Sequence, residues 1–217
     1  MTGGTSVKAF PVPPLPSLAE MAEGTLVKMN ESGAPVEFYV AKHDYESELN
    51  GAGRTLVVRK DCSQNYVWDY GTSHIYAGSY IDLWFNNNYK VKLDDEIISL
   101  ITTTKIQYTP EERGTTVSVL ERAIFALSLT ELGETHTFAN IEGTALPIAE
   151  LLKIAYLDGV ANKQWTRSPY TSTSYYAWSL TSSGSPDYRN LNEQKGVRPC
   201  FTLPSTVLVD EAMNIVA

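Results

Sequence analysis

The residues able to carry out acid–base or metal chemistry are few and dispersed in this sequence. The three histidines are His43, His74 and His136, and no two of them have the His-x-x-x-His spacing with which a helix holds a metal ion. His43 precedes Asp44 directly, but adjacent side chains of a strand point to opposite faces. We therefore expect each histidine to be a surface or core hydrogen-bonding residue.

The two cysteines, Cys62 and Cys200, allow two interpretations. They are either two buried reduced thiols or one disulfide, which requires an oxidising compartment. Two cysteines without nearby pairs of histidines cannot complete a structural zinc site.

Acidic and amide side chains form three short runs that could contribute to a calcium site. Such a site needs several oxygen ligands that converge. Residues 94–96 are expected at the start of a helix, 111–112 in a solvated loop, and 86–88 in a polar run that ends a helix. We predict no catalytic residue, no metal and no cofactor, and hence that the chain is not an enzyme.

Composition limits the remaining function classes. The chain has 217 residues, a net charge of −8 and 43% hydrophobic residues, which suffice for a packed core. An acidic chain is a poor nucleic-acid binder, because neutralising phosphates requires a basic face. Residues 1–10 have one lysine and no apolar core, and no apolar run reaches 18 residues. We expect neither a signal peptide nor membrane insertion.

One segment has a composition typical of binding surfaces. Residues 165–198 comprise 34 residues, of which 11 are Ser or Thr, 6 are Tyr or Trp and 6 are charged. Tyr and Trp provide a large contact area at low entropic cost, and small polar residues adapt their hydrogen bonds. The alternative is an ordinary surface of short polar strands and turns, which composition does not separate from a binding site.

The elements that position this segment follow from local patterns. Two β-rich runs, 25–29 and 36–41, flank a turn cluster and predict a hairpin, and 55–60, 105–108 and 123–128 are further strand candidates. Helices are expected after Ser79, over 93–101, and from about 146 to 156 with Gly159 beyond the end. We divide the chain into a Pro-rich N-terminal arm, 1–23, and a single domain, 24–217. The arm is either a flexible leader or a docking segment.

Several motifs in order resemble a known fold. Trp165-x-Arg167-Ser168-Pro169, an aromatic stretch, Gly184, and Gly196-Val197-Arg198-Pro199 with Phe201-x-Leu203 are similar to the closing half of a C-type-lectin-like fold. That variant includes the formylglycine-generating enzyme and the variable proteins of diversity-generating retroelements. Upstream motifs in 50–59, 80–86 and 125–133 resemble an uncharacterised domain family of phages and gut-dwelling Gram-positive bacteria. The resemblance covers roughly residues 24–205.

This resemblance implies an α+β, C-type-lectin-like fold with short antiparallel strands, two to three helices and long loops. It implies that Arg167 and Arg198 are framework residues, with an anion-binding pair as the alternative, and that Gly184 and Gly196 lie in turns with positive φ. Formylglycine-generating enzymes use two close cysteines near the end of the fold, whereas here only Cys200 lies there, which argues against that chemistry.

In the retroelement-type proteins the closing segment carries diversified, ligand-contacting positions. Mutagenesis directed at adenines in Asn codons often yields Tyr, Ser, Asp and Asn. Nine residues of this segment that fit this set of side chains form the predicted ligand-binding set: Tyr170, Ser172, Ser174, Tyr175, Tyr176, Asp187, Tyr188, Asn190 and Asn192.

We therefore expect a receptor-binding or adhesin protein, a phage virion component that is made in the host cytoplasm. Its expected partners are a host cell-surface protein or glycan and, through the N-terminal arm, other virion proteins. The alternative is a structural virion or bacterial cell-surface module that uses the same surface as a subunit interface, which implies a homo-oligomer.

Overall fold

The first sheet of the molecule is built around the hairpin that the sequence predicts. The computed structural model describes residues 13–216, and Ser32 and Gly33, both with positive φ, form the hairpin turn. The sheet is antiparallel with the order β1-β2-β3-β13. Its strands are β1 (Leu26–Glu31), β2 (Ala34–His43), β3 (Arg54–Arg59) and β13 (Cys200–Pro204).

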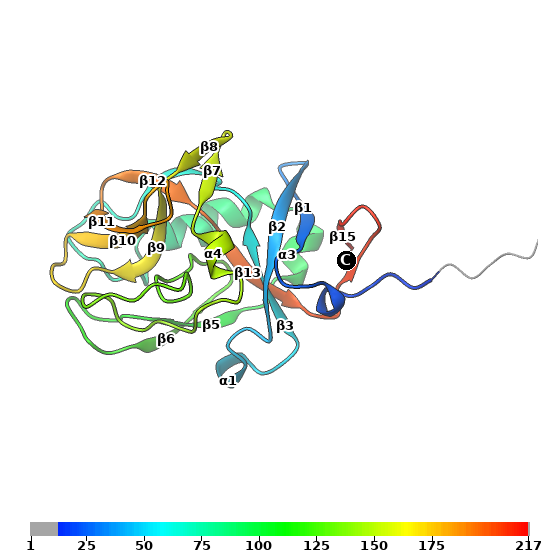
Figure 1. Ribbon diagram of the computed structural model, residues 1–217, viewed down its shortest axis with the longest axis horizontal. Helices are drawn as coiled ribbons and strands as arrows, with labels where there is room; N and C mark the ends of the chain where they lie inside the picture. The colour runs from blue at the N-terminus through cyan, green and yellow to red at the C-terminus, as the bar shows by residue number, and fades with distance from the viewer. Residues whose placement is uncertain (1–12, 217) are drawn as a thin grey trace, which may run out of the picture.

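The second sheet carries the Tyr/Ser-rich segment at the other end of the molecule (Figure 1). Its order is β11-β10-β9-β12-β4, and every pairing is antiparallel except that of β9 with β12. β9 is the central strand of this sheet, and all six of its residues are buried. The strands are β4 (Gln64–Val67), β9 (Gln164–Pro169), β10 (Tyr176–Leu180), β11 (Pro186–Asn190) and β12 (Gln194–Val197).

Three two-stranded sheets and several short helices complete the described chain. The two-stranded sheets are β5 (Thr104–Tyr108) with β6 (Ser118–Arg122), β7 (Ala155–Leu157) with β8 (Val160–Asn162), and β14 (Leu208–Val209) with β15 (Ile215–Val216). The α-helices are α1 (Ser47–Asn50), α2 (Tyr80–Leu83), α3 (Asp95–Leu100) and α4 (Ala149–Leu152). The other helical turns are a π-helix, Trp84–Tyr89, and two 3-10 helices, Leu18–Glu20 and Lys90–Lys92. The α+β class with short antiparallel strands is confirmed.

The residues at the start of α2 and α3 correctly predicted these two helices. Ser79 is the N-cap of α2, and its Oγ accepts a hydrogen bond from the Asp82 backbone N–H at 3.4 Å. Asp94 is the N-cap of α3, with Asp95 and Glu96 in the first turn, where the helix dipole favours acidic groups.

Three expectations for single elements were wrong. The helix expected from about 146 to 156 is only one turn, α4, after which the chain enters the β7–β8 hairpin. Gly159, with Asp158, forms the turn of that hairpin instead of ending a helix. Residues 124–128 are buried, but the run 123–128 is not a ladder strand, because only Phe125 pairs, in a single bridge with Cys200. Among described residues there are four α-helices where two to three were expected.

The part of the N-terminal arm that is described, 13–23, joins the domain at its first helical turn. Leu18 is fully buried, and its backbone N–H donates to Val207 O at 2.7 Å. Residues 1–12, which carry Pro11 and the start of the Pro-rich run, lie outside the described residues. In Figure 1 both ends of the described chain lie on the side opposite β10 and β11.

Candidate functional site

Six aromatic rings form a cluster on one face of β10 and β11. Tyr176 and Trp178 lie two positions apart on β10 and therefore point to the same face of the sheet. Tyr188 on β11 is the cross-strand partner of Trp178. Tyr170 stacks on Tyr188, with ring centroids 4.2 Å apart and planes 22° apart. The complete aromatic cluster comprises His136, Phe138, Tyr170, Tyr176, Trp178 and Tyr188.

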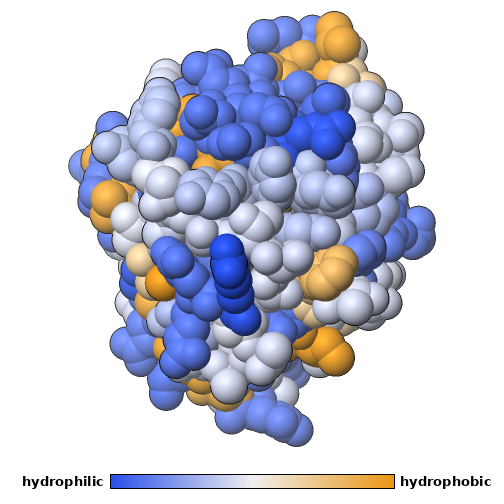
Figure 2. All heavy atoms as spheres, turned by 90° about the vertical axis from the view of Figure 1, so that its left-hand side faces the viewer, coloured by the Kyte–Doolittle hydropathy of each residue, from blue (hydrophilic) through white to orange (hydrophobic). Residues whose placement is uncertain are grey.

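The cluster is layered, with a buried base and an exposed rim. Trp178 is only 2% exposed and forms the base, whereas Tyr188 and Phe138 are 41% and 38% exposed. Tyr170 and Tyr176 are half-buried between them. Figure 2 views this end of the molecule. Much of this face has intermediate hydropathy, as Tyr, Ser and Thr residues have, and the hydrophobic residues form small, separate patches.

The nine predicted ligand-binding residues share this region but differ in exposure. Ser172, Tyr175, Tyr188, Asn190 and Asn192 are exposed. The half-buried residues are Tyr170, Tyr176 and Asp187. Ser174 is buried, with 9% of its surface exposed.

Sequence reasoning missed the two cluster members that lie outside the Tyr/Ser-rich segment. His136 packs on Trp178 with ring centroids 4.4 Å apart, and Phe138 packs on Tyr170 at 5.2 Å. The Phe138 carbonyl accepts hydrogen bonds from the Trp178 indole N–H and the Thr171 backbone N–H, both at 3.0 Å. No local signal marks residues 136–138 as neighbours of 170–188, because the sheet topology brings them together.

A cavity lined by both polar and apolar residues adjoins the cluster on the His136 side. Its volume is about 450 Å³, within the range of roughly 300–1,000 Å³ that small-molecule sites occupy. All of its lining residues belong to the loop that precedes α4. They are Thr130, Thr135, His136, Thr137, Ala139, Asn140 and Ile141.

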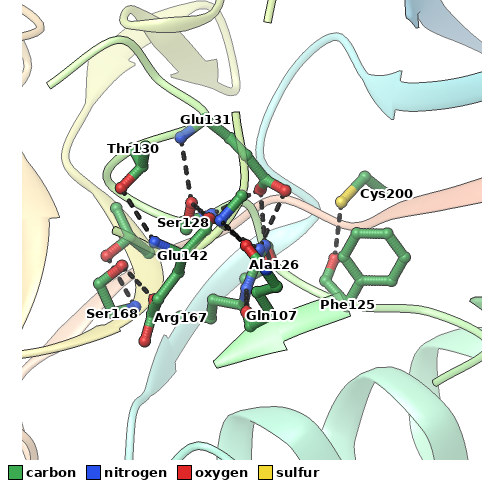
Figure 3. Close-up of polar contacts among 12 residues, drawn as sticks. Gln107, Phe125, Ala126, Ser128, Thr130, Glu131, Glu142, Arg167, Ser168 and Cys200 are labelled. Atoms are coloured by element: carbon green, nitrogen blue, oxygen red, sulfur yellow. Dashed lines mark hydrogen bonds and ion pairs between the residues drawn. The ribbon is translucent and has the colours of Figure 1, made fainter. Parts of the chain in front are cut away.

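A buried ion pair anchors that loop from below (Figure 3). Arg167 on β9 and Glu131 are both fully buried, and the guanidinium donates to the two carboxylate oxygens at 2.6 and 2.9 Å. Arg167 also donates to the carbonyls of Ala126 and Glu142 at 2.9 and 3.3 Å, so it contacts both ends of the loop. Burial is the largest single influence and lowers the pKa of Arg167. The charge of Glu131, its hydrogen bonds and the other acidic neighbours together outweigh burial and hold that pKa above its usual value.

A second buried carboxylate, Glu142, fixes the far end of the loop. Its Oε1 accepts from the Thr109 backbone N–H and hydroxyl, both at 2.7 Å, and its Oε2 accepts from the Ser168 hydroxyl at 2.6 Å. Burial raises the pKa of Glu142, against the opposing effect of Arg167. The loop has almost no regular secondary structure, so these polar contacts determine its conformation.

The framework interpretation of the two arginines agrees with their contacts. Arg198 is buried and donates to the carbonyls of Arg59, Leu152 and Lys60, each at 2.6 Å. Like Arg167, it is surrounded by internal partners and is not an accessible anion site. Gly184 has the expected positive φ, but Gly196 does not. Gly196 lies in β12, where an added Cβ would come within 2.3 Å of the Cys62 sulfur, so close packing requires the glycine.

The cysteines are free and buried, so the reduced-thiol interpretation is confirmed. Burial raises the pKa of Cys62 to about 11, and it also raises that of Cys200, whose thiol donates to the Phe125 carbonyl at 3.0 Å (Figure 3). A thiol with a raised pKa is a poor nucleophile near neutral pH.

The histidines act as hydrogen-bonding residues, as expected. His43 contacts Thr55 Oγ1 at 3.0 Å, and His74 Nε2 accepts from the Arg113 N–H at 3.1 Å. Over residues 13–216, no group of three or more His, Cys, Asp or Glu residues is placed to hold a metal ion. Within the same range, no helix has the length and apolar character needed to cross a membrane.

Comparison with known proteins gives a family but no named relative. No curated protein and no solved structure matches the chain. A family model described as "Domain of unknown function (DUF6273)" matches residues 52–205, which include β3 to β13 and the whole aromatic cluster. Because this match covers more than half of the sequence, the chain belongs to the DUF6273 family.

Proposed function

We propose that this chain is a receptor-binding protein whose aromatic cluster attaches to a component of a host cell surface. The observation that carries the proposal is the partly exposed set of rings from three chain segments, packed on one face of β10 and β11. Tyr-rich surfaces bind through rigid rings that lose little entropy, and small polar neighbours supply adaptable hydrogen bonds. The resemblance to C-type-lectin-like variable proteins supports the same proposal.

The arrangement of the chain favours display on a larger assembly. Both ends of the described chain lie opposite the aromatic cluster, so an attachment there would leave the cluster facing outwards (Figure 1). We assign the protein to a phage virion, bound to other virion proteins through the arm at 1–23. A bacterial cell surface is the alternative location.

Binding to a panel of bacterial cells tests this proposal. Tyr175 and Tyr188 are 51% and 41% exposed, so replacing both with Ser removes contact area from the exposed surface of the Tyr/Ser-rich segment. The matched control replaces Tyr70 and Tyr80, which are 65% and 46% exposed and form an edge-to-face pair at 5.2 Å outside the segment. We expect binding to be lost in the first variant only, with unchanged thermal unfolding in both.

The same experiment separates the proposal from its alternative. A folded wild-type protein that binds no cell, together with an oligomer that dissociates in the Tyr175→Ser/Tyr188→Ser variant, would identify the surface as a subunit interface. Equal loss of binding in both variants would contradict the assignment of the surface.

Diversification of the nine predicted residues is a separate part of the proposal. The gene from related isolates is expected to vary mainly at those positions. Substitutions spread evenly along the chain would refute it.

A further inference from the structure

The cavity beside the aromatic cluster has the features of a binding site for a neutral sugar. We infer that the cavity lined by Thr130, Thr135, His136, Thr137 and Asn140 binds the end of an uncharged glycan. This inference rests on the proposed function and specifies its ligand class. It adds residues that the Tyr/Ser-rich segment does not contain.

The polar groups of the cavity can both donate and accept hydrogen bonds, as sugar hydroxyls require. The Asn140 Nδ2 group donates to Thr109 Oγ1 and the Gly114 carbonyl, at 3.0 and 2.9 Å. Those bonds orient the amide, and within residues 13–216 no donor contacts its Oδ1. A ligand hydroxyl can therefore donate to Asn140.

His136 supplies the complementary donor. Its Nδ1 lies 3.3 Å from the Phe138 backbone N–H and accepts from it. In the neutral ring this bond assigns the proton to Nε2, which is then a donor on an exposed side chain. The exposed hydroxyls of Thr135 and Thr137 add groups that act in either sense.

Aromatic faces next to these groups suit the C–H face of a pyranose ring. The face of an aromatic ring is electron-rich and attracts the weakly positive C–H groups on one side of a sugar. Phe138 and Tyr188 are partly exposed rings of the cluster, and His136 belongs to both the cluster and the cavity wall. A bound glycan would thus extend from the cavity onto the cluster.

Charge selects against anionic ligands. The cavity lining contains no Lys or Arg, and the chain has a net charge of −8. A sialylated or phosphorylated glycan would find no cation in the cavity to pair with, and the overall field would repel it. The lining contains no Asp or Glu either, so it offers no partner for a cationic ligand.

The test is a printed array of neutral oligosaccharides, with sialylated and phosphorylated oligosaccharides on the same slide. We expect binding to neutral glycans only. Thr135→Val, which removes one exposed hydroxyl and keeps the shape, should weaken binding about fivefold, the effect of one hydrogen bond. His136→Ala should weaken it at least tenfold, because it removes a donor and a ring. Thr116→Val, exposed and outside the cavity, is the matched control and should bind as the wild type does.

The outcomes distinguish this inference from the proposed function. Binding to cells that needs Tyr175 and Tyr188 but is unaffected by Thr135→Val and His136→Ala would overturn the glycan site and leave the receptor-binding role intact. Preferential binding to the acidic glycans, or to cells only when their surface proteins are intact, would also overturn it. Binding to neutral glycans that resists the two tyrosine substitutions, but not the cavity substitutions, would support the cavity and contradict the proposed surface.

Discussion

Removing the Arg167 guanidinium should cost the protein several times more stability than breaking a surface ion pair of the same length. In Arg167→Met the Glu131 carboxylate stays fully buried without its cation. Breaking a buried pair on one side typically costs about 3–5 kcal/mol. The carbonyls of Gln107, Ala126 and Glu142 also lose a donor, so the cost should not fall below this range.

The matched control is the ion pair between Lys60 and Glu37. Its N–O distance is 2.6 Å, as in the buried pair, but its side chains are 37% and 40% exposed. Exposed pairs contribute about 0–1 kcal/mol because water screens both charges. Lys60→Met should therefore change the free energy of unfolding by less than about 1 kcal/mol.

Urea unfolding followed by tryptophan fluorescence measures both variants. With a denaturant slope of about 2 kcal/mol/M, Arg167→Met should lower the midpoint by roughly 1.5–2.5 M and Lys60→Met by less than about 0.5 M. Arg167→Lys keeps the charge but loses the planar fork, so it should lie between them and gives a value even if Arg167→Met does not fold. Similar midpoints for Arg167→Met and Lys60→Met would refute the argument from burial.

Three further variants test other contacts. Gly196→Ala places a Cβ 2.3 Å from the Cys62 sulfur and should lower the free energy of unfolding by about 1–3 kcal/mol in urea titrations, whereas Gly196→Ala combined with Cys62→Ala should recover part of the loss. Burial raises the pKa of Glu142 above 4.5, so its contribution to stability is full below that pH and is lost as the pH rises. Glu142→Gln should therefore gain stability relative to wild type between pH 4.5 and 8. A difference in unfolding free energy between the two proteins that stays constant with pH would contradict this. Burial lowers the pKa of His74 below 6.5, so the contribution of the neutral ring to stability is present above pH 6.5 and is lost as the pH falls. His74→Gln should therefore lose less stability than wild type from pH 6.5 to 5. Identical dependence of stability on pH in the two proteins would count against this prediction.

Local sequence signals predicted the elements whose determinants are adjacent in the chain. The β1–β2 hairpin follows from its turn residues, and α2 and α3 follow from Ser79 and the acidic first turn at 95–96. The strand predicted at 123–128 was wrong, because an apolar run indicates burial but not strand pairing. This run forms a single β-bridge, between Phe125 and Cys200. Gly159 fits a helix end and a hairpin turn equally well, since both require positive φ.

The candidate site was predictable only in part, for a physical reason. The Tyr/Ser-rich composition singled out residues 165–198, which include β10, β11 and the turn between them, because that residue content is typical of binding surfaces. His136, Phe138 and the acidic partner Glu131 come from a loop whose conformation depends on contacts distant in sequence. Glu131 is 36 residues from Arg167, and although it lies in the 125–133 motif, its local sequence does not indicate which residue pairs with it.

The anchoring of that loop explains how a surface could vary while the fold does not. The hydrogen bonds of Arg167, Glu131 and Glu142 involve none of the nine predicted ligand-binding residues. Those residues instead contact one another, their strand neighbours and the aromatic cluster. Substitutions at these nine residues therefore remove no side-chain partner of Arg167, Glu131 or Glu142. The chain thus separates the residues that determine its loop conformation from those that would contact a ligand, which is the arrangement that a diversified receptor-binding protein requires.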